Sequence, residues 1–118
     1  MATARELAQA ELLRAERARA GQRMVTLERE FADLAEAAAA AGTDDEHDPE
    51  GATLAFERQH SAALLDATRE QLAAIDAALQ RLETGRYGIC ERCGQPIGED
   101  RLAARPAAVT CIRCAATA

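Results

Sequence analysis

All four cysteines of the chain lie in two short sequences, YGICERCG at residues 87–94 and CIRC at residues 111–114. Each sequence contains one C-x-x-C pair. Two such pairs, separated by about 15 to 20 residues, are typical of a zinc site to which each pair supplies two thiolates. Two disulfides, an iron–sulfur cluster or a redox-active pair are the alternatives at this spacing. We predict that one zinc ion is bound by Cys90, Cys93, Cys111 and Cys114.

The predicted zinc ion has a structural role. Four thiolates fill its tetrahedral coordination shell, whereas a catalytic zinc ion keeps one position open. We therefore expect no catalytic residue and no enzymatic activity. Residues 85–118 contain few apolar side chains, so the metal is needed to fold this segment. The expected core residues of the segment are Tyr87, Ile89, Ile97, Leu102, Val109 and Ile112.

The rest of the composition indicates a mainly α protein. Only 3% of the 118 residues are aromatic and none is Trp, which leaves little material for a thick globular core. Residues 2–84 are rich in Ala, Glu, Arg and Leu, a composition typical of long helices and coiled coils. We expect these residues to form helices.

Two series of residues repeat at alternating spacings of three and four, which is the pattern of a coiled-coil seam. Arg17 is the one charged residue in the first series, and the second series becomes fully apolar from Leu72 onward. The first series is Leu13, Arg17, Ala20, Met24, Leu27, Phe31, Leu34, Ala38 and Ala41, and the second is Leu54, Arg58, Ser61, Leu65, Thr68, Leu72, Ile75, Leu79 and Leu82. The pattern predicts two helices with complementary apolar seams.

The segment between the two seams, GTDDEHDPEG at residues 42–51, is polar and contains Gly and Pro. It predicts a turn, so residues 1–84 are expected to form a long antiparallel coiled-coil hairpin, followed by a small zinc finger at residues 85–118. Asp48 is the expected N-cap and Pro49 the first residue of the second helix. Gly85 is expected to follow the end of that helix, near Thr84. Pairing with a second chain, as in a parallel dimer, is the alternative.

Charge is distributed unevenly along the chain. Residues 43–50 carry five carboxylates and no arginine, and the net charge of the chain is −6 with no lysine. This balance argues against sequence-specific nucleic-acid binding. The acidic tip at residues 43–50 is either a solvated loop or a surface that interacts with a cation or with basic side chains in a narrow cavity. No segment has the composition of a membrane span or a signal peptide, so we expect no membrane partner and a cytoplasmic location.

The zinc-finger segment resembles the zinc finger of the DksA/TraR family. The resemblance rests on GRYGICERCG at residues 85–94, IG at residues 97–98, RLAARP at residues 101–106 and CIRC at residues 111–114. It implies a bacterial transcription regulator that binds RNA polymerase directly, through the secondary channel, and not promoter DNA. In that family the acidic coiled-coil tip approaches the catalytic centre and modulates initiation, and the zinc module lies at the rim of the channel.

The resemblance also implies functional residues in the tip. The family tip reads Asp-x-x-Asp-x-Ala, so Asp45 and Asp48 are candidates, with Glu50 at the alanine position. Counting back from the zinc finger without gaps instead aligns Ala52 with that alanine and places His47 and Glu50 at the aspartate positions. Both registers remain open. Arg101 and Arg105 are candidate contacts to polymerase or to a phosphate.

The function has alternatives at this point. A Gre-like protein would use the tip acids to hold a second magnesium ion in the polymerase and promote transcript cleavage. A generic zinc-finger protein would bind another protein or DNA. The family's pocket for ppGpp uses lysines as well as arginine, and this chain has no lysine, so we do not count ppGpp among the expected ligands. Which promoters respond and in which direction, dependence on ppGpp, and oligomeric state are left open.

Overall fold

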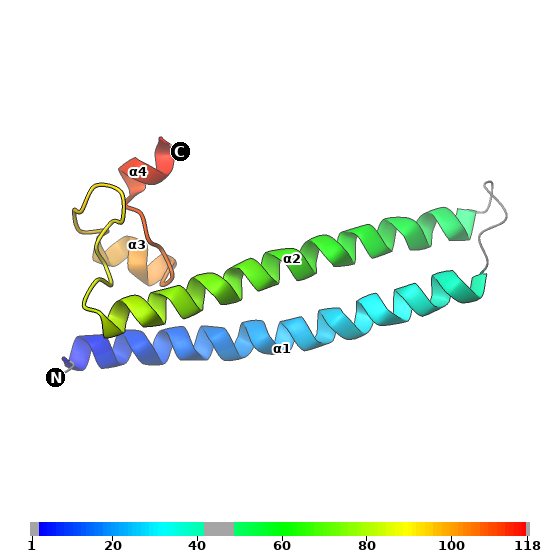
Figure 1. Ribbon diagram of the computed structural model, residues 1–118, viewed down its shortest axis with the longest axis horizontal. Coiled ribbons are helices and arrows are strands. Elements are labelled where there is room, and N and C mark those ends of the chain that lie inside the picture. Colours follow the sequence, from blue (N-terminus) through cyan, green and yellow to red (C-terminus); the bar gives the residue numbers. More distant parts are fainter. Residues whose placement is uncertain (1–2, 42–48, 118) are drawn as a thin grey trace. The chain divides into compact units, whose positions relative to one another are not determined.

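The computed structural model describes residues 3–41 and 49–117, and within these residues the chain is almost entirely helical. The elements in order are α1 (Ala4–Ala41), α2 (Pro49–Glu83), α3 (Glu99–Ala104) and α4 (Ile112–Ala116) (Figure 1). The described residues contain no strand beyond an isolated antiparallel bridge between Ile89 and Pro96. None of their helices combines the length and hydropathy of a membrane span. The predicted fold class, two long helices followed by a small cysteine-rich module, is confirmed.

A reciprocal capping box begins α1. The backbone N–H of Thr3 donates to Oε2 of Glu6 at 3.3 Å, and the backbone N–H of Glu6 donates to Oγ1 of Thr3 at 3.1 Å. Two N–H groups that the helix itself leaves without an acceptor are thereby satisfied. At the second helix, Pro49 is the first residue of α2, as predicted. The predicted N-cap, Asp48, lies outside the described residues.

A glycine ends α2, also as predicted. The last helical residue is Glu83, and Gly85 has a φ of 74°, which a residue without a Cβ adopts at little cost. The N–H of Gly85 donates to the carbonyl of Leu82 at 3.4 Å, and the N–H of Arg86 donates to the carbonyl of Arg81 at 2.8 Å. This pair of bonds is the Schellman motif. It turns the chain directly into the cysteine-rich segment.

The described residues form two compact units. The first contains the residues of α1 up to Arg19 together with all residues from Gln71 onward, and the second contains Ala20–Glu70. In the first unit the side chains of Leu13 and Ile75 are fully buried, and Ala78 is buried to the same degree. Figure 1 shows α3 next to the C-terminal part of α2, and α4 farther from α2, beyond α3. The predicted boundary between a hairpin and a finger at residue 85 stays a prediction.

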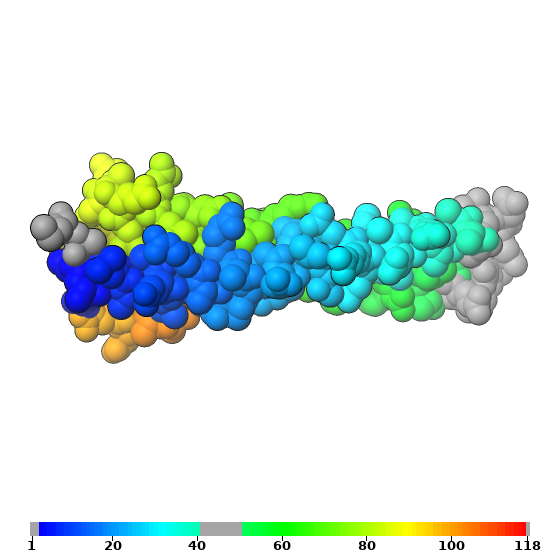
Figure 2. Space-filling view, turned by 90° about the horizontal axis from the view of Figure 1, so that it is seen from below, coloured from blue at the N-terminus to red at the C-terminus, as the bar shows by residue number. Residues whose placement is uncertain are grey.

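In the second unit, most heptad positions face the neighbouring helix, whereas Arg58, a predicted seam residue, is exposed. Ala20, Leu27 and Leu65 are buried, and so are the two polar seam residues Ser61 and Thr68. The space-filling view shows the cyan segment of α1 packed against the green segment of α2 (Figure 2). The two predicted seams therefore meet within one chain and form an antiparallel helical pair.

Arg17, which interrupts the first seam, lies at its edge and not in its core. Its Nε donates to Oδ1 of Asp76 at 2.5 Å, and its Nη2 donates to Oδ2 at 3.4 Å. The hydrogen bond and the charge of Asp76 raise the pKa of Arg17, while the hydrogen bond from Arg17 lowers the pKa of Asp76. Both side chains are about half exposed, with 52% of each accessible, so the pair adds little stability. Its effect is to accommodate a charge at a seam position.

Candidate metal centre

The structure brings the four cysteines together. Cys90 and Cys93 lie in the loop that follows α2, Cys111 is the N-cap of α4, and Cys114 lies within α4. All four Sγ atoms lie within 4.8 Å of one another. Residues that are separated in sequence by α3 and its flanking loops therefore form one cluster.

The spacing of the sulfur atoms fits a zinc ion and excludes a disulfide. Sγ of Cys93 is 3.7 Å from Sγ of Cys111, and all four cysteines are free. A disulfide would need a distance of about 2.05 Å. A tetrahedral zinc ion with Zn–S bonds of about 2.3 Å separates its ligands by about 3.8 Å. The thiolates would complete the coordination of the ion, whose contribution is to hold the segment folded.

Backbone hydrogen bonds shape the first cysteine pair. The N–H of Gly94 donates to the carbonyl of Cys90 at 2.9 Å and closes the turn that contains both ligands. The N–H of Cys90 donates to the carbonyl of Gln95 at 2.8 Å, and the N–H of Ile97 donates to the carbonyl of Gly88, also at 2.8 Å. These bonds hold the two sides of the loop together, so Cys90 and Cys93 are positioned by the backbone.

The second cysteine pair begins a helix. The N–H of Ala115 donates to the carbonyl of Cys111 at 2.9 Å, which is the first helical bond of α4. The N–H of Glu91 donates to the carbonyl of Val109 at 2.9 Å and joins the segments that carry the two pairs. The backbone therefore supports a site with two ligands from a turn and two from the start of a helix.

The electrostatics of the cluster favour thiolates at two of its positions. The backbone N–H groups of Cys111 and Cys93 lower the pKa of Cys90 to about 6, because they stabilise negative charge on its sulfur. The backbone N–H of Cys114 likewise lowers the pKa of Cys111. Hydrogen bonding to the Cys111 and Cys90 side chains raises the pKa of Cys114 to about 12. A bound cation favours the thiolate form at all four ligands.

The core around the cluster is small. Cys90, Ile97, Leu102 and Cys111 are buried, and Tyr87, Ala108 and Cys114 pack against them. The expectation that Ile89 and Ile112 belong to this core is wrong, because 42% and 69% of these residues are exposed. Each stands next to a ligand whose side chain turns inward, and neighbours along an extended segment, or at the start of a helix, point elsewhere.

Four side chains tie the loops of the finger to one another, and sequence reasoning did not assign these bonds. Each donates to a backbone carbonyl, which fixes the path of an irregular segment. Tyr87 Oη donates to Pro106 at 2.8 Å, Arg101 Nε to Thr110 at 2.8 Å, Arg92 Nη1 to Cys114 at 3.1 Å, and Arg81 Nη2 to Arg86 at 3.1 Å and Ile89 at 2.5 Å. Burial, followed by the charge of Glu16, raises the pKa of Tyr87.

Arg101 and Arg105, the candidate polymerase or phosphate contacts, have different environments. Arg101 is half-buried, and its Nε is used in the bond to Thr110, next to the ligand Cys111. Arg105 is exposed at the end of α3. The structure gives Arg101 an internal structural role, and an external contact by either arginine stays a prediction.

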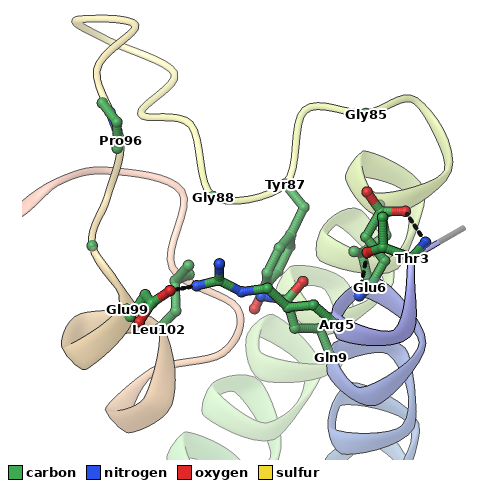
Figure 3. Close-up of a pocket in the computed structure, with 12 residues that line it drawn as sticks. Thr3, Arg5, Glu6, Gln9, Gly85, Tyr87, Gly88, Pro96, Glu99 and Leu102 are labelled. Atoms are coloured by element: carbon green, nitrogen blue, oxygen red, sulfur yellow. Dashed lines mark hydrogen bonds and ion pairs between the residues drawn. The ribbon is translucent and has the colours of Figure 1, made fainter.

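A cavity of about 410 Å³ lies where the start of α1 meets the finger. In Figure 3, Tyr87 and Leu102 line it, and an ion pair between Arg5 and Glu99 joins α1 to α3. Both charged side chains are well exposed, so the pair contributes little stability. The cavity is therefore lined by residues from both ends of the sequence, and all of them belong to the first compact unit.

The predicted tip residues are not part of this described site. Asp45 and Asp48 lie outside the described residues, and nothing is assigned to the side chain of Glu50, in the first turn of α2. Within residues 3–41 and 49–117, the four cysteines form the one group of potential metal ligands. The role of the tip therefore stays a prediction.

Comparison with known proteins identifies the family. Residues 85–118 match the model of the prokaryotic dksA/traR C4-type zinc finger. The solved structure of transcription factor DksA2 from Pseudomonas aeruginosa matches with a TM-score of 0.79 and 31% sequence identity, over 97% of this chain and 82% of that chain. This chain belongs to the DksA/TraR family. The four-cysteine cluster is accordingly a DksA/TraR zinc finger, and the prediction of one zinc ion is confirmed.

Curated DksA/TraR relatives match over shorter segments. The RNA polymerase-binding transcription factor DksA of Caulobacter vibrioides is 54% identical over 43 residues, which are 36% of this chain and 30% of the relative. The protein of the same name from Haemophilus influenzae is 45% identical over 49 residues, covering 42% of this chain and 34% of the relative. The matched segments thus span about a third of these curated relatives.

Proposed function

We propose that this protein is a bacterial transcription regulator that binds RNA polymerase directly. One observation carries the proposal: the likeness to transcription factor DksA2 extends over 97% of the chain and includes the helical pair as well as the finger. A likeness confined to the finger would support only a shared metal-binding module. The names of the curated DksA relatives add RNA polymerase as the partner.

The proposed mechanism is electrostatic. The helical hairpin enters the secondary channel, and the carboxylates of the tip at residues 43–50 approach the catalytic centre. Negative charge at that position alters the field around the catalytic metal and the stability of the initiating complex. Asp45 and Asp48 carry this effect in one register, and His47 and Glu50 in the other.

The finger and the helices have no catalytic role in this proposal. Four thiolates leave a zinc ion no open position for a substrate. A net charge of −6 without lysine opposes direct binding to DNA, so specificity would come from the polymerase and its promoter. A partner of this kind would place the protein in the bacterial cytoplasm.

The test combines binding to core RNA polymerase with initiation from a ribosomal promoter. The zinc-loaded protein is compared with Asp45→Asn/Asp48→Asn, with His47→Ala/Glu50→Gln, and with Glu28→Gln/Glu36→Gln as a control for loss of charge elsewhere on α1. Binding by all four, with loss of the initiation effect in one tip variant only, would support the mechanism and decide the register. Absence of binding by the parent protein would reject the proposed function.

A further inference from the structure

The second compact unit, Ala20–Glu70, contains a groove that the proposed mechanism does not use. The groove has a volume of about 410 Å³ and is lined by both α1 and α2. Its apolar wall consists of Leu34, Phe56 and Leu64. Phe56 is 70% exposed, a large fraction for a phenylalanine side chain. Water, and not protein, therefore covers most of this ring in the isolated chain.

The sequence places the lining residues on matching helix faces. Glu57, Ser61 and Leu64 follow one another at intervals of four and three along α2, and along α1 Glu30 is followed three and four residues later by Asp33 and Leu34. Each helix thus presents carboxylates beside an apolar residue. The lining contains three carboxylates, from Glu30, Asp33 and Glu57, together with the imidazole of His60, and neither arginine nor lysine.

Ser61 supplies a second, independent observation at this groove. It is 5% exposed, and its Oγ has no hydrogen-bond partner among the described residues. A buried hydroxyl without a partner is costly, and such groups are rare in folded proteins. Ser61 lines the groove, so a donor group that enters there and displaces the side chains covering its Oγ supplies the missing bond.

The charge of the groove decides what can occupy it. A second copy of this chain, with its own net charge of −6, would bring carboxylates against carboxylates, and a nucleic acid would bring phosphates. A segment with an arginine or lysine next to an apolar side chain matches both the carboxylates and the apolar wall. A cation can also lie against the exposed face of Phe56.

We propose that this groove docks a basic amphipathic segment of RNA polymerase. The apolar side chain of the segment packs on Phe56 and Leu64, its cation pairs with Asp33 and Glu57, and one of its donors reaches Ser61. The identity of the partner rests on the proposed function, whereas the chemistry of the segment follows from the groove. The docking site is formed by residues other than the acidic tip, so it contributes affinity and not the effect on initiation.

Matched variants test the two parts of the contact. Phe56→Ala is compared with Val25→Ala, which removes an exposed apolar side chain from the same unit outside the groove. Since exposed aromatic anchors often dominate an interface, Phe56→Ala should weaken binding to core RNA polymerase about tenfold or more, and Val25→Ala should not. Asp33→Asn/Glu57→Gln should weaken binding and reduce its dependence on salt, unlike Glu28→Gln/Glu70→Gln.

Ser61→Ala separates docking from folding because the two effects have opposite signs. Removing a buried hydroxyl that lacks a partner should leave the melting temperature of the free protein unchanged or raise it. The same change should weaken binding to core RNA polymerase, because the bound donor loses its acceptor. A variant with unchanged affinity would overturn the role of Ser61 in the docking site.

Crosslinking identifies the occupant. A photoreactive phenylalanine analogue at position 56 of the full-length protein is irradiated in complex with core RNA polymerase, and the crosslinked peptide is sequenced. A peptide with arginine or lysine beside apolar residues would support the proposal; an acidic peptide, a second copy of this chain or no crosslink would overturn it. If the parent protein binds polymerase and all groove variants bind equally, the groove inference alone fails. If the parent does not bind, the proposed function fails and the inference fails with it.

Discussion

Nη2 of Arg81, in the last turns of α2, donates to the carbonyl of Ile89 at 2.5 Å and to the carbonyl of Arg86 at 3.1 Å. Ile89 directly precedes the zinc ligand Cys90. One side chain of the long helix therefore holds both ends of the short segment that leads to the metal. This contact and the Schellman turn at Gly85 connect α2 to the finger by fixed hydrogen bonds.

Replacing Arg81 should loosen the start of the finger. Arg81→Ala removes both bonds, and we expect a loss of about 1 to 2 kcal/mol in the free energy of unfolding of the zinc-loaded protein. Urea unfolding followed by circular dichroism measures the loss. Arg86→Ala, which removes a neighbouring exposed guanidinium, is the control. Equal stability of the two variants would contradict the role given to Arg81.

Removing the metal should unfold the finger and leave the long helices. The buried core of the finger consists of only a few side chains, so Cys90→Ser or a strong chelator should unfold residues 86–117. Most of the helical circular dichroism should remain, because Leu13 and Ile75 pack independently of the metal. Amide hydrogen exchange and a zinc content of about one ion per chain before treatment check this expectation. Full exchange protection of the finger after zinc removal would contradict it.

Replacing Gly85 and Gly21 with alanine should change the free energy of unfolding in opposite directions. Gly85 has a φ of 74°, so Gly85→Ala should lower the free energy of unfolding by about 1 kcal/mol. Gly21 lies inside α1, and a Cβ added there would meet no atom within 4 Å. Gly21→Ala should therefore raise the free energy of unfolding, by up to about 1 kcal/mol. Thermal unfolding of both variants measures the direction of each change. A Gly85→Ala variant more stable than the parent would contradict the role of Gly85 at the C-terminal end of α2.

Titration of Asp76 should contribute to the loss of folding stability at acidic pH. The hydrogen bond from Arg17 lowers the pKa of Asp76 in the folded protein, so the pair's stabilisation is present above the ordinary aspartate value of about 3.9 and is lost as pH falls through the lower folded value. The exposure of the pair keeps this effect small. NMR titration of the Asp76 carboxyl should show its pKa rising toward the ordinary value in Arg17→Gln. An unchanged pKa would show that the bond does not persist in solution.

The sequence predicted those features that depend on short-range patterns. The spacing of the cysteines identified the ligands, the heptad positions identified the buried faces, and Pro49 and Gly85 marked the ends of α2. The Thr3-x-x-Glu6 sequence is a capping-box signal of the same local kind, and it begins α1. Each of these signals lies within a few residues of the structure that it specifies.

Other features depend on how distant residues meet, and no local pattern specifies them. Asp76 accommodates Arg17 from the other helix, and Tyr87 bonds to the carbonyl of Pro106 across the finger. The exposure of Ile112 and the groove around Phe56 follow from the same three-dimensional arrangement. Hydrophobicity alone placed Ile112 in the core, because composition does not reveal which way a side chain points.

The hydrogen bond from Tyr87 to the carbonyl of Pro106 allows opening of the finger to be detected by intrinsic tyrosine fluorescence. Tyr87 is the only tyrosine of the chain, which has no tryptophan. All tyrosine emission therefore comes from a phenol that is bonded to a carbonyl in the folded finger and to water once the finger opens. Opening of the metal-binding end can therefore be followed by tyrosine fluorescence in the unlabelled protein, in real time, because α1 and α2 contain neither tyrosine nor tryptophan.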